Sequence, residues 1–88
     1  MTYRVGDESS RRVIDVAIGV LVGLRGCSDR EAFEELVRVV HQTGVGLGRL
    51  AAGLVALASG SATAEHAEAF SAWGDLIRRE RDTLASAV

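Results

Sequence analysis

The sequence predicts an all-α fold, and three observations support this. The 88 residues include no proline, so no segment is barred from forming a helix. Apolar residues recur at spacings of three and four along four segments, which is the period of an amphipathic helix. Stretches rich in glycine or other small residues separate these segments, as expected for turns. We therefore predict three packed helices followed by an amphipathic fourth helix.

The first predicted helix carries one apolar stripe, formed by Val13, Ile14, Ala17, Leu21 and Leu24. Ser9 or Ser10 is expected to cap its N-terminus, and Gly26 to end it in a left-handed conformation. Gly19 and Gly23 each cost about 1 kcal/mol relative to alanine inside a helix. We therefore expect another helix to approach closely at one of these two glycines.

The second predicted helix has the clearest start signal in the sequence. Ser28 and Glu31 stand in the S-x-x-E relation of a capping box, directly before an apolar stripe. That stripe consists of Ala32, Phe33, Leu36, Val37 and Val40. Glu34 and Arg38 have the spacing of an i,i+4 ion pair on the more polar side. Because few residues separate the first two helices, we expect them to be neighbours.

Two further helices are expected after the central glycines. The third has an apolar stripe formed by Leu47, Leu50, Ala51, Leu54, Val55 and Ala58. The fourth has an apolar stripe formed by Phe70, Trp73, Ile77 and Leu84, interrupted at Glu80. This second stripe is too large to remain in water, so the fourth helix either covers the core or pairs with a second copy of the chain. The expected organisation is an N-terminal tail (1–8), a three-helix domain (9–58) and a C-terminal helix (63–86).

Gly44, Gly46 and Gly48 alternate in the middle of the chain and raise the question of a phosphate-binding loop. Such a loop joins a buried strand to the N-terminus of a helix. Here a helical pattern precedes the glycines, no strand pattern follows them, and the sequence contains no lysine. We therefore predict a turn between two helices, with Gly44 ending the second one.

Composition narrows the possible functions. The net charge is −2 and all ten basic residues are arginine, so overall charge does not indicate nucleic-acid binding, although a local basic face remains open. The single Cys27 and two histidines, His41 and His66, form no recognisable zinc pattern, so we expect no metal and no cofactor. No paired carboxylates or nucleophile and base occur at an informative spacing, so we expect no enzyme. No apolar run reaches the roughly 20 residues that a bilayer requires, and no signal peptide is evident, so we expect a cytoplasmic protein.

Two short patterns point to a known family. They are A-x-G-x-L from Ala17 to Leu21 and A-F-x-x-L from Ala32 to Leu36. Other residues follow in the matching order: Ile14, Cys27, Ser28, Arg38, Thr43, Leu47 and Ala51. This order resembles the ANTAR family, small RNA-binding domains of bacterial transcription antitermination regulators. The resemblance runs without gaps from residue 11 to residue 56.

The chain departs from the family at several positions. Ile18 stands where the family usually has lysine, and Val22 where methionine is common. Val37 stands where arginine is frequent. At the glycine turn, Gly44 replaces the family's asparagine and Gly46 a nearby basic residue. The side chains expected to face RNA at this turn are therefore absent.

The resemblance implies a three-helix fold, often dimeric, that grips paired stem-loops in a nascent transcript and prevents a terminator hairpin from forming. The candidate RNA-binding residues near the matching region are Arg11, Arg12, Arg38, His41, Thr43 and Arg49. The candidate residues for a homodimer are Phe70, Trp73, Ile77 and Leu84. The alternative is an ANTAR-derived module for dimerisation or protein interaction that has lost RNA binding.

The resemblance also makes predictions about regulation and about the core. The family domain usually follows a receiver or ligand-sensing domain, and no segment of that size precedes residue 11, so a separate sensor or regulator protein is an expected partner. The fold requires one set of side chains from successive helices to converge in a single core. That set is Ile14, Ala17, Phe33, Leu36, Leu47 and Ala51.

Overall fold

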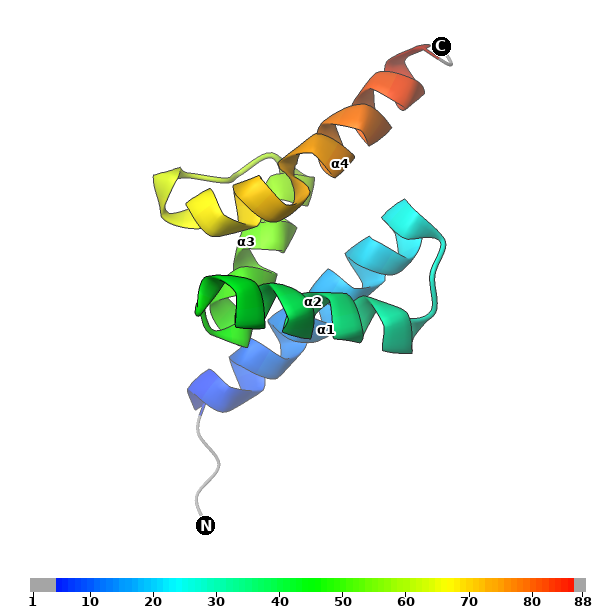
Figure 1. Ribbon diagram of the computed structural model, residues 1–88. Helices are drawn as coiled ribbons and strands as arrows, with labels where there is room; N and C mark the ends of the chain where they lie inside the picture. Colours follow the sequence, from blue (N-terminus) through cyan, green and yellow to red (C-terminus); the bar gives the residue numbers. More distant parts are fainter. Residues whose placement is uncertain (1–4, 87–88) are drawn as a thin grey trace.

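The computed structural model describes the backbone of residues 5–86 and the side chains of residues 11–83. Figure 1 shows the arrangement of its helices. They are α1 (Val5–Arg25), α2 (Asp29–Thr43), α3 (Leu47–Ser59) and α4 (Ala67–Ser86), with the short 3₁₀ helix η1 (Ala64–His66) before α4. The described residues contain no strand. The all-α fold with a C-terminal fourth helix is therefore confirmed.

Helix α1 begins earlier than the sequence predicted. Its first residue is Val5, so Ser9 and Ser10 lie inside the helix, and the expected N-cap at either position is wrong. Residues 5–8, expected to belong to the tail, are helical. Serine is only a weak obstacle inside a helix, so a good capping residue can be passed over when helical residues precede it. The predicted end is confirmed, because Gly26 has a φ of 68°.

Both ends of α2 are as predicted. The Ser28 hydroxyl accepts the N–H of Glu31 at 3.1 Å, and the Ser28 N–H donates to Glu31 Oε1 at 3.0 Å, which completes the capping box. The hydrogen bonds from the backbone and then the side chain of Ser28 lower the pKa of Glu31 from its ordinary value of 4.5. At the other end, Gly44 has a φ of 74° and its N–H donates to the Val40 carbonyl at 2.8 Å.

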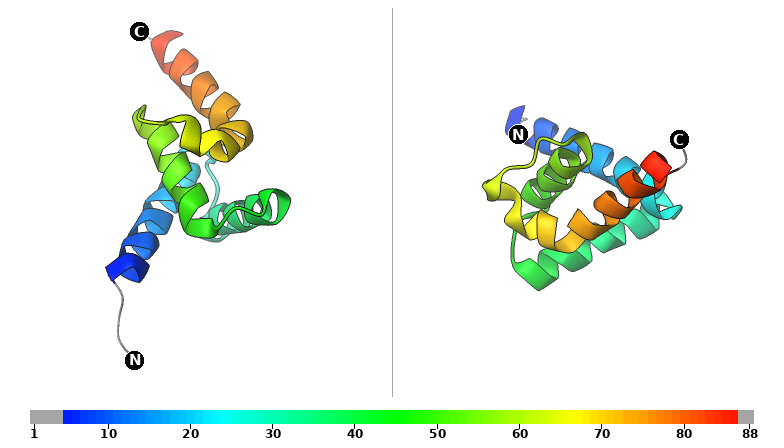
Figure 2. Two further views of the ribbon diagram at one scale, coloured as in Figure 1. Left: turned by 90° about the vertical axis from the view of Figure 1, so that its left-hand side faces the viewer. Right: turned by 90° about the horizontal axis from the view of Figure 1, so that it is seen from above.

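Helix α3 is central, because it packs against α1, α2 and α4 (Figure 2). The buried cluster around it draws on all four helices: Ala17, Leu21, Ala32, Leu36, Val39, Leu50, Ala51, Leu54, Leu57, Ala69, Trp73 and Ile77. Five of the six side chains predicted to converge take part, since Ile14 and Leu47 pack half-buried against this cluster.

Phe33 is the exception among those six. Its side chain is 41% exposed, so its predicted place in the core is wrong. The neighbouring Ala32 is fully buried. Successive residues of a helix point about 100° apart, so when Ala32 faces the core, Phe33 falls on the flank. The small side chain at position 32 lets α2 lie close to the other helices.

Helix α4 covers the core. Trp73 and Ile77 are buried, at 1% and 7% exposure, and Trp73 is the largest fully buried side chain of the described part. Close approach of two helices occurs at Gly53, where an added Cβ would lie 2.6 Å from the Cβ of Ala69 on α4. The approach expected at Gly19 or Gly23 is wrong, because an added Cβ at either position would meet nothing within 4 Å.

One carboxylate joins three helices. Glu35 on α2 accepts from Trp73 Nε1 of α4 at 2.8 Å. It also pairs with Arg25 of α1, with 2.7 Å between Arg25 Nε and Glu35 Oε1 and 2.9 Å between Arg25 Nη2 and Glu35 Oε2. The predicted pair of Glu34 with Arg38 is wrong, because Glu34 pairs with Arg30 instead, at 3.6 Å.

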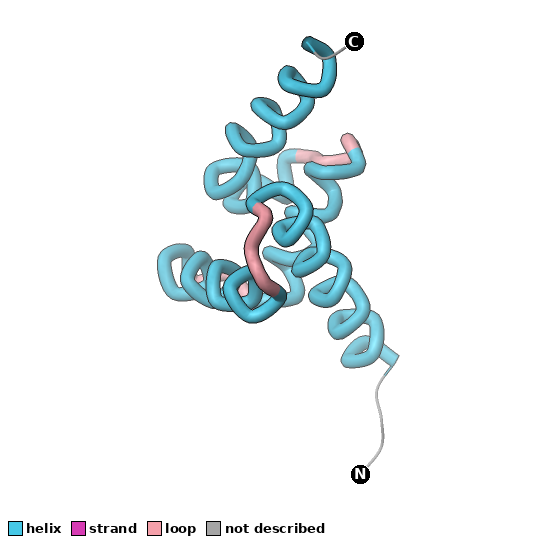
Figure 3. Tube along the Cα trace, turned by 90° about the vertical axis from the view of Figure 1, so that its right-hand side faces the viewer, coloured by secondary structure: helices cyan, strands magenta, loops and turns pink. Residues whose placement is uncertain are grey.

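The connections between the helices are short (Figure 3). The longest, after α3, begins with Gly60 at a φ of 79° and reaches η1 through Thr63, whose N–H donates to His66 Nδ1 at 3.1 Å. No single helix among the described residues is long and apolar enough to cross a membrane. The consecutive segments Leu47–Ser59 and Ala64–Thr83 meet the length and composition test only as a pair bent by 120°.

Candidate RNA-binding surface

The turn between α2 and α3 is built from backbone and one hydroxyl. Thr43 Oγ1 donates to the Val39 carbonyl at 2.8 Å and accepts the N–H of Val45 at 3.1 Å. This candidate RNA-binding side chain therefore holds the turn in shape. The residues that follow, Gly44 and Gly46, carry no side chain that would stand between the backbone and a ligand.

The N-terminus of α3 has no side-chain cap. Gly46 is the N-cap residue, with φ −64° and ψ 151°, and the first turn of α3 contains no acidic residue. The N–H of Leu50 donates to the Gly46 carbonyl at 3.0 Å and so begins the helical pattern. The N–H groups of Leu47, Gly48 and Arg49 therefore have no acceptor within the helix. The helix dipole adds partial positive charge at the same end. Such an end is well suited to bind a phosphate.

Arg49 stands at this uncapped end. It is exposed, whereas every other residue from Leu47 to Leu57, all of them described by the structure, is buried or half-buried. An arginine in the first turn is unfavourable for the helix dipole, and no carboxylate of that turn offsets it. The helix dipole therefore gives Arg49 no stabilising role at this position.

The charges of α2 are separated along its length. The acidic residues Asp29 and Glu31 lie in its first turn, and Arg38 and His41 lie near its end, both exposed. This order agrees with the helix dipole, and it places positive charge beside the α2–α3 turn. Among side chains 11–83, ion pairs join Arg25, Arg30 and Arg78 to carboxylates, and none involves a candidate arginine.

Arg11 and Arg12 are exposed on α1. Figure 1 shows the start of α1 on the same side as the α2–α3 turn, but both views of Figure 2 show the two apart, with α3 between them. No hydrogen bond joins any two of the six candidate residues among those that the structure describes. None of the six lines a hollow that the structure shows among the described residues.

The candidate dimerisation residues are divided by the structure. Trp73 and Ile77 are buried within a single chain, as expected for the core-covering alternative of the fourth helix. Phe70 is 60% exposed. The side chain of Leu84 lies outside the described residues. Glu80, the interruption in the apolar stripe, is half-buried.

A comparison with protein-family models decides the family. The model described as "ANTAR domain" matches residues 7–55, more than half of the chain and in the same position as the predicted resemblance. The chain belongs to the ANTAR family. This is a family of RNA-binding transcription antitermination regulators. No curated protein and no solved structure matches the chain.

The ANTAR match contains the whole α2–α3 turn and ends within α3. Helix α4 lies beyond it, although Trp73 and Ala69 belong to the same core. Sequence reasoning identified Arg49 but missed the uncapped helix end beside it. The signal was present in the sequence, because Gly46 precedes a helical stripe and neither it nor Leu47, Gly48 and Arg49 offers a capping acceptor.

Proposed function

We propose that this protein is a small regulator of transcription antitermination that binds stem-loops in nascent mRNA, as a homodimer in the cytoplasm. Membership of the ANTAR family supports RNA as the ligand. The observation that carries the proposal is the uncapped N-terminus of α3 with the exposed Arg49 beside it. Together they offer backbone N–H groups, a helix dipole and a guanidinium to one phosphate.

The glycine turn explains how RNA is bound without the family's usual polar side chains. Gly44 and Gly46 let a sugar–phosphate backbone approach the main chain closely. Arg38 and His41 then bind neighbouring phosphates or bases from the end of α2, while Arg11 and Arg12 extend the basic surface along α1. In this arrangement the main chain replaces the missing asparagine and basic side chain.

A dimer is part of the proposal for an energetic reason. Each phosphate contact adds only about 0.7 to 0.9 to the log–log salt slope of binding, so a single copy with few arginines binds weakly. Two linked copies bind two stem-loops with an effective concentration that raises the affinity without any new contact. Holding both stem-loops keeps their strands out of a competing terminator hairpin.

Electrophoretic titration of a transcript with tandem stem-loops tests the proposal. We expect Arg49→Ala to weaken binding and to reduce the salt slope by about 0.7 to 0.9, because one phosphate contact is lost. Arg30→Ala is the matched control. Arg30 is an exposed arginine at the opposite end of α2 and pairs with Glu34. An equal loss of RNA affinity in both variants would mean that only the net charge of the chain matters, not a contact at Arg49. Absence of RNA binding by the unmodified chain at low salt would overturn the RNA proposal.

A second pair of variants separates RNA binding from helix stability. Gly46→Asp supplies α3 with a negatively charged N-cap, which stabilises the helix by a few tenths of a kcal/mol or more. The same carboxylate repels a phosphate, so we expect a higher melting temperature and weaker RNA binding. Gly46→Ser supplies a neutral cap and serves as the control. Unchanged RNA binding by Gly46→Asp would exclude a phosphate at this helix end.

The alternative function remains a protein-interaction module, and the exposed Phe70 favours it. The ratio of nucleic-acid absorbance to protein absorbance, measured on freshly purified protein before and after ribonuclease treatment, discriminates between the two functions. RNA carried through purification supports the antitermination regulator. Robust self-association without any RNA, before or after treatment, supports the interaction module.

A further inference from the structure

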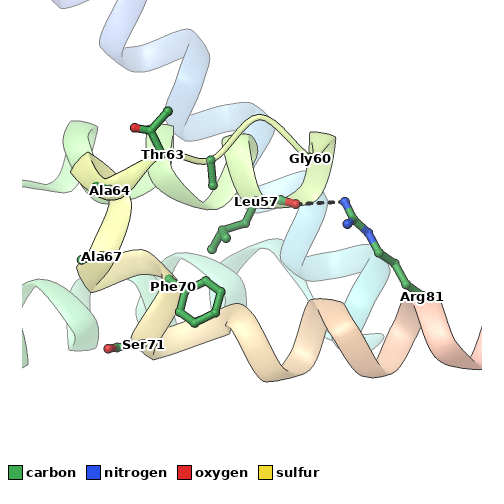
Figure 4. Close-up of a pocket in the computed structure, with 9 residues that line it drawn as sticks. Leu57, Gly60, Thr63, Ala64, Ala67, Phe70, Ser71 and Arg81 are labelled. Atoms are coloured by element: carbon green, nitrogen blue, oxygen red, sulfur yellow. Dashed lines mark hydrogen bonds between the residues drawn. The ribbon is translucent and has the colours of Figure 1, made fainter.

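Three connected hollows follow the side of α4 that borders the end of α3. We call them together the α4 groove. The largest, about 560 Å³, lies between η1, α4 and the end of α3 (Figure 4). A second, of about 280 Å³, shares Leu57, Phe70 and Arg81 with it. A third, of about 220 Å³, shares Ile77 and Arg81 with the second and adds Leu24 of α1.

The lining of the α4 groove is mostly apolar, and its arginine and threonine side chains bind groups within the chain, while Glu80 and Asp82 add negative charge. Arg81 Nη2 donates to the carbonyls of Leu57 and Ala58, at 3.2 and 3.3 Å, and so caps the end of α3. The Thr63 hydroxyl accepts the N–H of Glu65 at 3.3 Å. The Ser71 hydroxyl points away from Phe70 and Leu57 (Figure 4). The groove therefore favours an apolar occupant over a small anionic ligand.

Phe70 supplies an apolar group of the required kind on the same surface. Its side chain is 60% exposed, although it lines both of the larger hollows. The ring lies over Gly74, where an added Cβ would be 3.3 Å from it. A surface that presents a projecting aromatic ring beside open hollows is complementary to itself. A two-fold symmetric pair requires this property, because each copy offers the same surface to the other.

Charge along α4 fixes the direction of such a pair. Asp75 and Arg78 are both well exposed, with 80% and 67% of their side chains accessible, and they pair with each other. Two parallel α4 helices would place like charges opposite each other. In an antiparallel pair whose two-fold axis passes between Leu76 and Ile77, Asp75 lies opposite Arg78 of the second copy. Phe70 then reaches the far end of the second copy's groove.

We propose that the α4 groove docks a second copy of this chain, with the two α4 helices antiparallel and Phe70 of each copy inserted into the groove of the other. This interface specifies the homodimer of the proposed function. It requires no RNA, so its test is independent of whether the chain binds RNA.

Sedimentation of the ribonuclease-treated full chain over a range of concentrations tests the interface. We expect the unmodified chain to dimerise and Phe70→Glu to raise the dissociation constant by at least about tenfold, as for a central aromatic contact. Phe33→Glu is the matched control, because Phe33 is an exposed phenylalanine on α2 outside the groove. Phe70→Ala, checked by circular dichroism, repeats the test if Phe70→Glu does not fold. A monomeric unmodified chain, or a dimer weakened only by Phe33→Glu, overturns the proposal.

Charge reversal tests the antiparallel direction. Arg78→Asp places two carboxylates opposite each other across the pair and is expected to weaken dimerisation. Adding Asp75→Arg to the same chain restores opposite charges and is expected to restore the dimer. A double variant that stays as weak as Arg78→Asp overturns the antiparallel arrangement. Loss of RNA binding with an intact dimer would contradict the antitermination function and leave this interface standing.

Discussion

The segment that matches the ANTAR family and the helix that follows it contribute to one core in different ways. Among the largest fully buried side chains, the family segment supplies Leu21, Leu36, Leu50 and Leu54, which come from three helices. Helix α4 supplies the largest, Trp73. The helices of the family segment are also joined by turns of three residues, whereas α4 is reached through a longer connection.

This difference shows that the boundary of a family is not the boundary of a core. The ANTAR match ends at residue 55, yet Gly53 within it packs directly against Ala69 of α4. The contact at Gly53 is so close that even a methyl group would meet Ala69. In this chain α4 is part of the folding unit, and the same helix also carries the exposed Phe70.

Removal of α4 is expected to have the largest effect. A chain ending at Gly60 loses Ala69, Trp73 and Ile77 from the core and exposes Leu54 and Leu57. Domains of this size have a small free energy of unfolding. We therefore expect the shortened chain to show no cooperative thermal transition by circular dichroism. A chain ending at Ser86 retains the whole helix and is the control. Cooperative melting of the shorter chain at the same temperature would show that the family segment folds alone.

Trp73 is expected to dominate the contribution of α4. Trp73→Ala should lower the free energy of unfolding by about 3 to 5 kcal/mol, the range for removing a buried aromatic side chain. Trp73→Phe keeps most of the buried area but removes the Nε1 hydrogen bond to Glu35. It should therefore lower the free energy of unfolding by less than Trp73→Ala does. Urea denaturation measures both. Equal losses in the two variants would assign the stability to the hydrogen bond instead of to burial.

The sequence predicted the features that depend on near neighbours. The capping box at Ser28 and the left-handed glycines Gly26 and Gly44 were predicted correctly, because each is decided within one turn of a helix. Specific hydrogen bonds between distant residues were not predicted. Glu35 binds Trp73, which lies 38 residues away, and no spacing rule within α2 indicates that partner.

The candidate site shows the same limit. The exposed arginines could be identified from their types and positions, whereas Thr43 was selected as a polar contact and is occupied by the turn. The uncapped end of α3 consists of backbone groups, so only the absence of a capping side chain from Gly46 to Arg49 marks it in the sequence. Phe33 and Phe70 look like core residues in the sequence. Their exposure depends on how each helix is rotated against its neighbours.

Paired glycine substitutions compare the α3–α4 contact with an open face of α1. At Gly53 an added Cβ would be 2.6 Å from Ala69, so Gly53→Ala must push α4 away, and overpacking of this kind costs about 1 to 3 kcal/mol. At Gly23 nothing lies within 4 Å, so Gly23→Ala should stabilise α1 by up to about 1 kcal/mol. Thermal unfolding should show shifts of opposite sign. Two stabilising shifts would mean that α4 lies farther from α3 than described.

The smallest expected effect is confined to the family segment. Hydrogen bonds from Ser28 lower the pKa of Glu31 in the folded chain, so the ionised carboxylate contributes stability at neutral pH. This contribution is present above the unfolded pKa and is lost as the pH falls below the ordinary value of 4.5. Glu31→Gln keeps the capping geometry without a titrating group, so its melting temperature should approach that of the unmodified chain as the pH falls from 7 through this range. No hydrogen bond among the described residues joins Glu31 to Trp73. The difference in melting temperature made by Glu31→Gln should therefore shrink with falling pH in a Trp73→Ala background as well, if that variant still unfolds cooperatively. If Glu31→Gln changes the melting temperature by the same amount at every pH, both in the unmodified chain and in Trp73→Ala, the charge of Glu31 does not stabilise the start of α2.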